Sequence, residues 1–452
     1  MKKLIAILAL IALTGNIAGA ELLKNFKYDG KVEVNSWQKR NTDFNKTVND
    51  KRNDTDVRVQ VNMGFDLNDD VDAVVSLVKN NRQYGAGNER IGNIESNPVP
   101  PTAGSTGILG QLVVEQAYMN LKGVFGMDHK LGRQYYGNEG DLVVYYGPQS
   151  WPYKVDHIAQ TNQLSVAATD GWTGWYKADK LNLHALMFRA AQGQAAADTD
   201  THIWGVVAGY DLADDIKLGG YHYRQDRQSG VAAGPDTTLG VIGAKVNAKF
   251  YGFTYGVELA KNVGTYNENV SDAGLMTGIA TKGDFTGRGM KFNAGYEMDV
   301  IGKLAFNGEF ARGTGDTITT DNEVKSFQSI NGDYRPGIIW GGGHLPVGGE
   351  GIANLKTWNI GAKWNPEAME KLTLKAKLFS FSPTKKLLGT AKAYDAYGSE
   401  FNLCANWQHS EDVGVKAYYA TFMPDDDFAT RNSTIARDDA TSVLGAAFNV
   451  KF

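Results

Sequence analysis

The chain ends on the stretch LGAAFNVKF, residues 444–452. Its apolar side chains occupy every second position, at Leu444, Ala446, Phe448, Val450 and Phe452. The positions between them carry Ala447, Asn449 and Lys451. Because successive side chains of a β-strand point to opposite faces, this stretch predicts a strand with one apolar and one polar face. Such a strand suits a wall with lipid on one side and water on the other.

The two ends of the sequence point to the same compartment. A terminal phenylalanine on such a strand resembles the C-terminal signal by which bacterial outer-membrane barrels are recognised for insertion. Residues 1–20, MKKLIAILALIALTGNIAGA, combine two lysines, a short apolar run and small residues at the end. This pattern predicts a signal peptide cleaved before Glu21, since the apolar run is shorter than the ~20 residues of a membrane anchor. We therefore expect residues 21–452 to form one domain in the outer membrane of a Gram-negative cell.

The composition excludes other classes of protein. A mean hydropathy of −0.34, with 53 glycines, 21 tyrosines and 9 tryptophans, argues against a helical membrane protein but agrees with strands that are half apolar. Without the two lysines of the signal, the chain has 44 basic and 50 acidic residues. It therefore lacks the excess of basic residues that is typical of nucleic-acid-binding proteins. The single cysteine, Cys404, excludes an internal disulfide.

Alternating stretches bounded by turn residues predict about 18 strands, joined by connections that are alternately long and short. Short turns are expected at Asp69-Asp70, Gly123–Gly126, Asp179, Asp214-Asp215, Phe250, Val300, Pro366–Glu370 and Glu411-Asp412. Longer segments separate them, and the longest, Thr314–Gly351, is the best candidate to fold over or into a pore, although it could equally pack outside as a surface loop. This rhythm is typical of a transmembrane antiparallel β-barrel with short periplasmic turns and long extracellular loops. A soluble sandwich or propeller would also alternate, but it predicts neither the rhythm nor the two end signals.

Several short motifs resemble the alginate-export family of outer-membrane porins. They are Glu115–Met119, Leu131–Gln134, Gly147 with Trp151, Phe310–Asp316, and Gly398–Glu400 at the start of a strand. The resemblance implies a monomeric barrel of 18 strands and, as in the type member, an arginine- and lysine-lined lumen that passes a polyanionic polysaccharide outward. It also implies a possible periplasmic export partner. The acidic mature chain departs from a strongly positive conduit.

The lumen of such a pore would recognise anions through lysine and arginine, because a polyuronate carries one carboxylate on each sugar. Strand parity gives pore-lining candidates at Arg58, Lys245, Lys249, Lys291, Lys363, Lys375 and Lys377. Carboxylates are expected to face inward as well, so ion pairs across the lumen are the structural alternative. These carboxylates are Glu33, Asp66, Glu258, Glu297, Glu309 and Glu400.

Three further arginines, Arg133, Arg189 and Arg312, are candidates near the outer ends of their strands. Simple parity points them towards lipid, where an arginine is costly. A β-bulge or a position above the apolar zone would resolve this conflict. The family motif supports Arg133, which we rank with Arg58 for the constriction.

The sequence therefore predicts an outer-membrane porin that passes an alginate-like polysaccharide or small anionic solutes by passive transport. A general small-solute diffusion porin is the alternative. A hydrolase at the barrel rim is a third reading, but the chain has no GxSxG, no HExxH and no Cys/His metal spacing, and no cofactor or metal is predicted. The expected partners are outer-membrane lipid, the anionic cargo and a periplasmic export protein, with no nucleic acid and a monomeric state.

Overall fold

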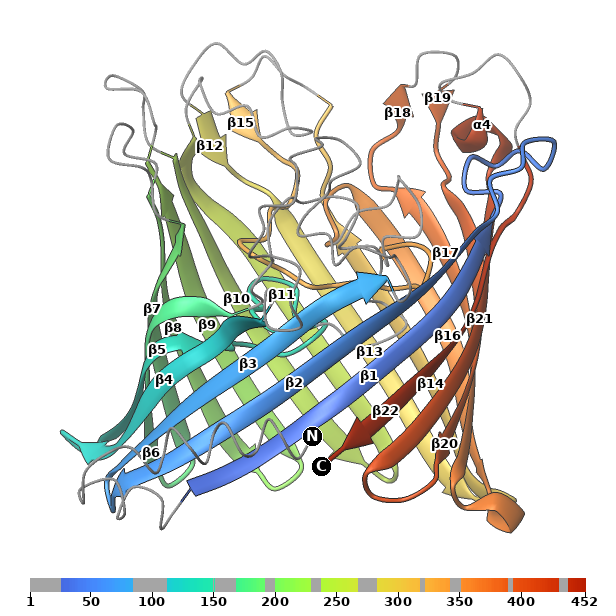
Figure 1. Ribbon diagram of the computed structural model, residues 1–452. Coiled ribbons are helices and arrows are strands. Elements are labelled where there is room, and N and C mark those ends of the chain that lie inside the picture. The colour runs from blue at the N-terminus through green and yellow to red at the C-terminus, as the bar shows by residue number, and fades with distance from the viewer. Residues whose placement is uncertain are drawn as a thin grey trace, which may run out of the picture.

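The computed structural model describes residues 26–83, 112–148, 150, 168–191, 200–228, 237–266, 283–317, 322–341, 351–388, 393–430 and 438–452. Eighteen long strands form one closed antiparallel barrel, with the short turns at one end and the longer connections at the other (Figure 1). The strand number and the architecture confirm the prediction from alternation. The predicted signal peptide, residues 1–20, lies outside the described residues.

The first half of the wall runs from β1 to β9. Its strands are β1 (Phe26–Arg40), β2 (Arg52–Asn68), β3 (Val71–Gln83), β4 (Leu112–Val124), β5 (Met127–Gln134), β6 (Thr169–Ala178), β7 (Leu181–Ala191), β8 (Thr201–Ala213) and β9 (Ile216–Arg227). The second half is β10 (Thr237–Phe250), β11 (Phe253–Tyr266), β13 (Arg288–Asp299), β14 (Gly302–Gly313), β16 (Leu355–Pro366), β17 (Leu372–Pro383), β20 (Gly398–Gln408), β21 (Val413–Pro424) and β22 (Thr441–Lys451). Each strand pairs with the next along the chain.

Several short strands and one short helix lie at the outer end of the barrel. They are β12 (Gly283–Phe285), β15 (Glu323–Val324), β18 (Leu387–Leu388), β19 (Ala393–Tyr394) and the four-residue helix α4 (Asp426–Ala429). A 3-10 turn, η1 (Glu367–Met369), lies at the opposite end. Among the described residues, no helix is long and apolar enough to cross a membrane.

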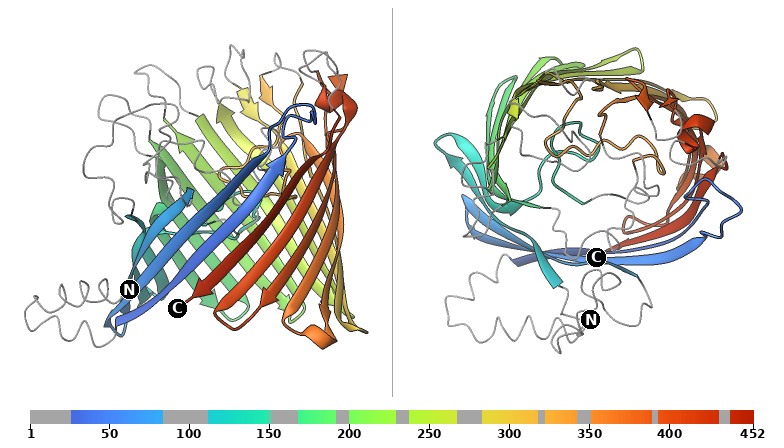
Figure 2. Two further views of the ribbon diagram at one scale, coloured as in Figure 1. Left: turned by 45° about the vertical axis from the view of Figure 1, so that its right-hand side comes forward. Right: turned by 90° about the horizontal axis from the view of Figure 1, so that it is seen from above.

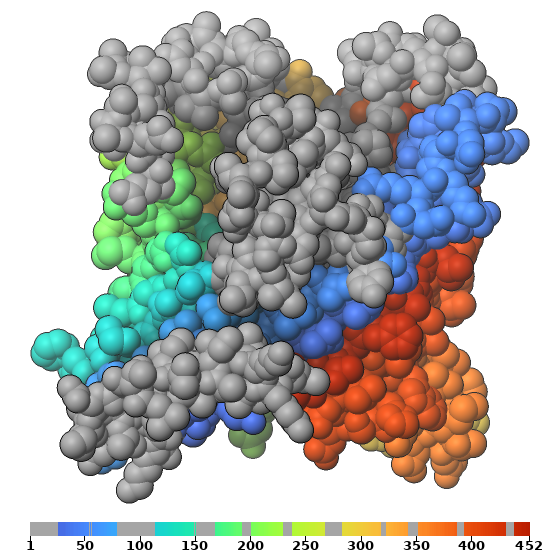
Figure 3. Space-filling view, in the orientation of Figure 1, coloured from blue at the N-terminus to red at the C-terminus, as the bar shows by residue number. Residues whose placement is uncertain are grey.

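The barrel closes where its first and last strands meet. β1 pairs with β22 antiparallel from Lys31 opposite Lys451 to Arg40 opposite Ser442. Gly30 and Phe452 then exchange both backbone hydrogen bonds, at 2.9 and 3.0 Å. In the space-filling view the red residues of the last strands lie directly against the blue residues of the first (Figure 3). Closure pairs the first strand with the last, so the described residues of β1 and β22 do not form the exposed edges of an open sheet.

The predicted short turns are all present, and local backbone geometry explains one of the tightest. Phe250 pairs with Phe253, so Tyr251 and Gly252 form a two-residue hairpin turn. Both central residues have positive φ, at 49° and 83°. This is the geometry of the turns whose twist matches that of the flanking strands.

The two faces of the wall differ as the alternation predicts. On β10, Ile242, Val246 and Phe250 are 40–49% exposed on the outer surface, while Val241 on the other face is fully buried. Inside the outer half of the barrel, an apolar cluster forms where two connecting segments fold inward (Figure 2). The sequence named Thr314–Gly351 as the segment to fold over or into the pore, and its described residues 322–341 do fold inward. The sequence also predicted a wet lumen and did not predict this apolar cluster.

Candidate functional site

Two segments fold into the lumen and pack on each other. They are residues 135–148, between β5 and β6, and residues 322–341, between β14 and β16 (Figure 2). Val144 forms a parallel β-bridge with Asn331, and the Asn331 amide donates to the carbonyl of Val143 at 2.9 Å. Leu142 is fully buried between them. The two segments therefore form one inward structure that narrows the pore.

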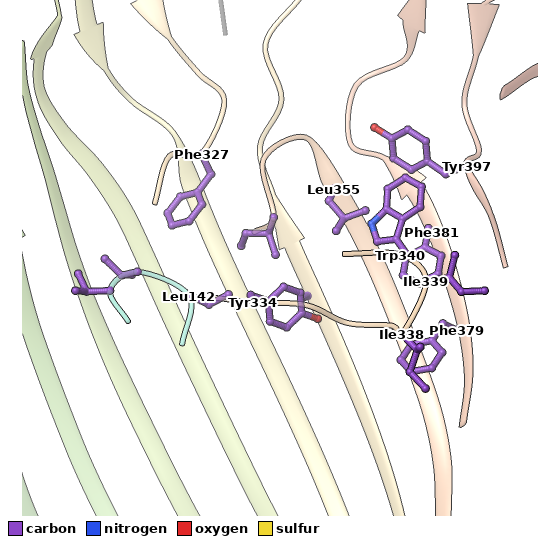
Figure 4. Packing of buried hydrophobic residues seen from close by; sticks show 14 of the residues in the cluster. Leu142, Phe327, Tyr334, Ile338, Ile339, Trp340, Leu355, Phe379, Phe381 and Tyr397 are labelled. Atoms are coloured by element: carbon purple, nitrogen blue, oxygen red, sulfur yellow. The ribbon is translucent and has the colours of Figure 1, made fainter. Parts of the chain in front are cut away.

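The wall holds the second segment through a carboxylate. Glu400 of β20 accepts hydrogen bonds from the amides of Ile338, Ile339 and Trp340, at 2.7, 3.0 and 2.8 Å. The Trp340 ring stacks on Phe381 of β17, with centroids 5.0 Å apart (Figure 4). Charge-assisted bonds and aromatic packing together fix this turn against the wall.

A second contact links the same segment to β14. The Tyr334 hydroxyl donates to Glu309 at 2.7 Å. Burial, followed by the charge of Glu309, raises the pKa of Tyr334 well above its usual value, so the phenol keeps its proton and its donor role. The position of the inward segment therefore depends on two wall carboxylates.

Several predicted lumen cations lie between carboxylates. The Arg58 guanidinium lies 3.6 Å from Glu33 and 3.7 Å from Glu115, and its side chain is almost fully buried. Lys245 lies 3.4 Å from Glu258, which is also 3.7 Å from Lys291. These side chains lie on the inner face of the wall, where carboxylates neutralise them as in the structural alternative, and their role in lining the conduction path stays a prediction.

Lys245 has a further partner that the strand pattern did not predict. Asp141, on the first inward segment, lies 3.5 Å from the Lys245 ammonium group. The sequence offered one signal: an apolar run, Leu142–Val144, within a connection expected to be exposed. An apolar run in a loop must be buried somewhere, and here it is buried inside the barrel.

The opposite part of the lumen has a different charge pattern. We call Lys363, Lys375 and Lys377 the lysine wall; they lie on β16 and β17 and face inward. Lys363 is directly opposite Lys375 in the register. Among the described residues, no carboxylate lies within 4 Å of the amines of Lys363, Lys375 or Lys377.

Most polar side chains around the lysine wall are neutral, and Glu309 on the nearby strand β14 is an acidic residue that acts electrostatically on Lys377. The inward positions of β16, β17, β20 and β21 carry one carboxylate, Glu400, which the amides of the inward segment already occupy. The others include asparagines at Asn359, Asn402 and Asn406, and the thiol of Cys404 opposite Lys375. Like charges this close are costly unless an anion or water compensates them. The lysine wall is therefore the candidate anion-binding surface.

The other predicted residues fall into two groups. Lys249 faces the lumen near the short turn of β10 and is exposed. The side chains of Arg133, Arg189 and Arg312 lie on the outer face of the barrel. Each is next in sequence to a residue that faces inward, as Arg312 is next to the fully buried Ala311. The structure thus corrects their prediction as pore-lining residues. The physical reason is strand parity, and the register shift that directly follows Arg189 leaves that side chain on the outer face.

Arg133 and Arg189 are stabilised on the outer face by acidic partners. Arg133 makes a two-bond pair with Asp170, at 2.9 and 2.7 Å, on the adjacent strand β6. Arg189 pairs with Asp200. The family motif that favoured Arg133 for the constriction therefore marks a contact of the outer wall.

These features define an outer-membrane channel of the porin class: a closed barrel of 18 strands, an apolar outer face and a charged lumen narrowed by inward segments. The chain belongs to the alginate export family, whose model matches residues 111–436. The family and the fold place it in the bacterial outer membrane.

Solved structures share the fold at low sequence identity. OccAB2 of Acinetobacter baumannii gives a TM-score of 0.58 at 10% identity, covering 96% of this chain and 99% of that one. OccK8 (OprE) of Pseudomonas aeruginosa gives 0.56 at 12% identity, covering 95% and 98%. No curated protein matches the chain by sequence.

Proposed function

We propose that this channel conducts anions selectively, with an alginate-like polyuronate or a smaller anionic solute as cargo. The observation that carries the proposal is the lysine wall: none of its amines has a described carboxylate within 4 Å, and lumen cations of this kind raise the local concentration of anions. The paired cations Arg58, Lys245 and Lys291 contribute less, because Glu33, Glu115 and Glu258 neutralise them.

The inward segments limit the size of the solute that can pass. Residues 135–148 and 322–341 fill part of the outer lumen with a packed apolar cluster. A narrowed passage favours the second candidate, a diffusion channel for small anionic solutes, over a polymer conduit. A polymer would need these segments to move, and an export partner at the periplasmic mouth would have to deliver it.

Planar-bilayer recording tests the proposal. The reversal potential in a KCl gradient should show anion preference in the wild type. The double variant Lys375→Gln/Lys377→Gln should lower the anion-to-cation permeability ratio about fivefold, because a nearby charge in water contributes roughly 1 kcal/mol. Lys356→Gln is the matched control, because it removes the same charge from the outer face of β16. Cation preference in the wild type would refute the proposal.

Two further readouts of the same experiment separate the cargoes. Block by oligouronates that the double variant loses supports a polyuronate, while anion preference without block supports small solutes. Cys404 is the only cysteine and lies opposite Lys375. An anionic thiol reagent should therefore modify it faster than a cationic reagent of similar size, and the double variant should reduce that difference.

A further inference from the structure

Four cations occupy outward positions on neighbouring strands at the outer end of the barrel. We call them the outer cation cluster: Lys261 on β11, Arg288 on β13, Arg312 on β14 and Lys356 on β16. Lys261 is directly opposite Arg288, and Arg312 is directly opposite Lys356. All four side chains are exposed, while the inward residues beside them, Asn262, Ala311 and Thr357, are at most 1% exposed.

The cluster lies at the upper edge of the apolar outer surface. The next outward residue on each strand, towards the short turns, is large and apolar: Leu259, Met290, Phe310 and Trp358. A tilted strand crosses the hydrocarbon in about 9–11 residues. Arg312 is ten residues from Gly302, where β14 begins. The cluster is therefore at the level of the lipid headgroups in the outer leaflet.

Three outward arginines on β5–β9 have acidic partners. Arg133, Arg189 and Arg224 each contact an aspartate, at Asp170, Asp200 and Asp226. In the part of the chain that the structure describes, no carboxylate oxygen lies within 4 Å of the charged groups of the outer cation cluster.

The outward carboxylate of the described strands nearest in register is Asp284. It lies opposite Thr265, two outward positions beyond Lys261 on the extracellular side. The wall thus supplies an anion for its outward arginines on β5–β9 and leaves four cations without one on β11–β16.

An apolar groove runs down the same outer face below the cluster. Its floor is a row of small residues, Ala294, Gly308, Ala362 and Ala376, and larger side chains such as Tyr296, Phe306 and Leu378 form its sides. Its volume is about 590 Å³. Gly308 is four residues from Arg312 on β14, a separation of about 13 Å along an extended strand.

We propose that the outer cation cluster and this groove bind one phosphorylated glycolipid of the outer leaflet. The phosphates contact the four cations, and an acyl chain lies in the groove beneath. Charge complementarity selects the headgroup, because guanidinium and ammonium groups bind phosphate strongly where water is partly excluded. The groove supplies the second requirement, apolar contact at acyl-chain depth, which a free phosphate ion does not use.

Native mass spectrometry of the folded full chain in detergent micelles tests the site, with diphosphoryl lipid A as the probe. The wild type should retain lipid A, and Arg312→Gln/Lys356→Gln should weaken retention about fivefold for each charge removed. Arg189→Gln/Arg224→Gln is the matched control and should retain lipid A within about twofold, because those arginines already have aspartate partners. Channel conductance should be unchanged in both variants, which separates this site from the lumen.

A second variant tests the groove, and it keeps the proposal testable if the first variant does not fold. A Cβ at Gly308 would meet only the Asn359 carbonyl oxygen, at 3.6 Å, so Gly308→Leu fits the wall and fills the groove. Reduced lipid A retention by this variant supports the proposal. Equal retention by the wild type and the Arg312/Lys356 variant, equal retention of dephosphorylated lipid A, or full competition by inorganic phosphate would overturn it.

Discussion

At the scale of single residues, the buried carboxylates of the lumen hold the inward structure in place. Glu400 accepts three backbone amides from one turn, and Glu309 accepts the hydroxyl of Tyr334. Sequence parity predicted that both would face inward, but it did not show that a loop distant in sequence would bind them. A carboxylate that already accepts these bonds is a poor partner for the lysine wall, which keeps that surface positive.

Glu400→Gln should loosen the inward segment. A carboxamide has one acceptor oxygen, and its NH₂ group would face amides that also donate, so at least one buried donor loses its partner at a cost of about 2 kcal/mol. The denaturation midpoint should fall, and single-channel recordings should show larger current fluctuations. Glu309→Gln is the control, because its carboxamide oxygen can still accept from Tyr334. Equal behaviour of the two variants would contradict this role for Glu400.

At the scale of elements, the two inward segments stabilise each other. The Asp333 amide donates to the carbonyl of Asp141 at 2.9 Å, and Leu142 is enclosed between the segments and the wall. Neither segment has regular secondary structure of its own over most of its length. Their order therefore comes from packing against each other and against the aromatic residues of β17 and β21.

Leu142→Ala should release part of this packing. Truncation of a fully buried leucine costs about 2–5 kcal/mol, depending on how far the site collapses. We expect a lower unfolding midpoint together with a larger mean conductance, because a looser inward structure obstructs the pore less. Asn138→Ala, an exposed change on the same segment, should leave both quantities at wild-type values. Unchanged conductance in Leu142→Ala would show that these segments do not set the pore width.

At the scale of the whole molecule, the barrel depends on one junction between residues that are far apart in sequence. β1 and β22 close the wall, and the connections above them are linked as well: the Lys46 ammonium group lies 2.8 Å from Asp439. Phe44 packs near Phe422 and Phe428 at the same place. Until this junction forms, both strands expose unpaired edges.

Gly30→Val should impair closure. A Cβ at Gly30 would lie 2.5 Å from the Phe452 ring and 2.8 Å from the backbone oxygen of Gln60, and the second contact cannot be relieved by a side-chain rotation. The fraction of barrel that migrates as folded on an unheated gel should drop. Gly64→Val is the control, since a Cβ there meets nothing closer than 3.8 Å. A normal folded fraction in Gly30→Val would show that this close approach is not required.

The prediction succeeded where local pattern decides and failed where contacts between distant segments decide. Alternation gave the strands, the short turns and the inward face of Arg58, Lys245 and Lys363. It could not distinguish Lys245, which has two carboxylate neighbours, from Lys363, which has none within the described residues, because neighbours across the lumen are not neighbours in sequence. For Arg312 the parity argument was right, and the assignment to the pore was wrong.

The sequence by itself determined the strands of the barrel and its location in the outer membrane. LGAAFNVKF, residues 444–452, and the strands like it alternate because one face contacts lipid and the other contacts water. Only the tertiary structure decided what the wall surrounds. It folded two connections into the lumen and held the second through Glu400 and Glu309. It also placed the lysine wall where no described carboxylate lies within 4 Å of its amines. The reason is that a two-residue period fixes the direction of each side chain, whereas its partners depend on which strands the closed barrel brings face to face.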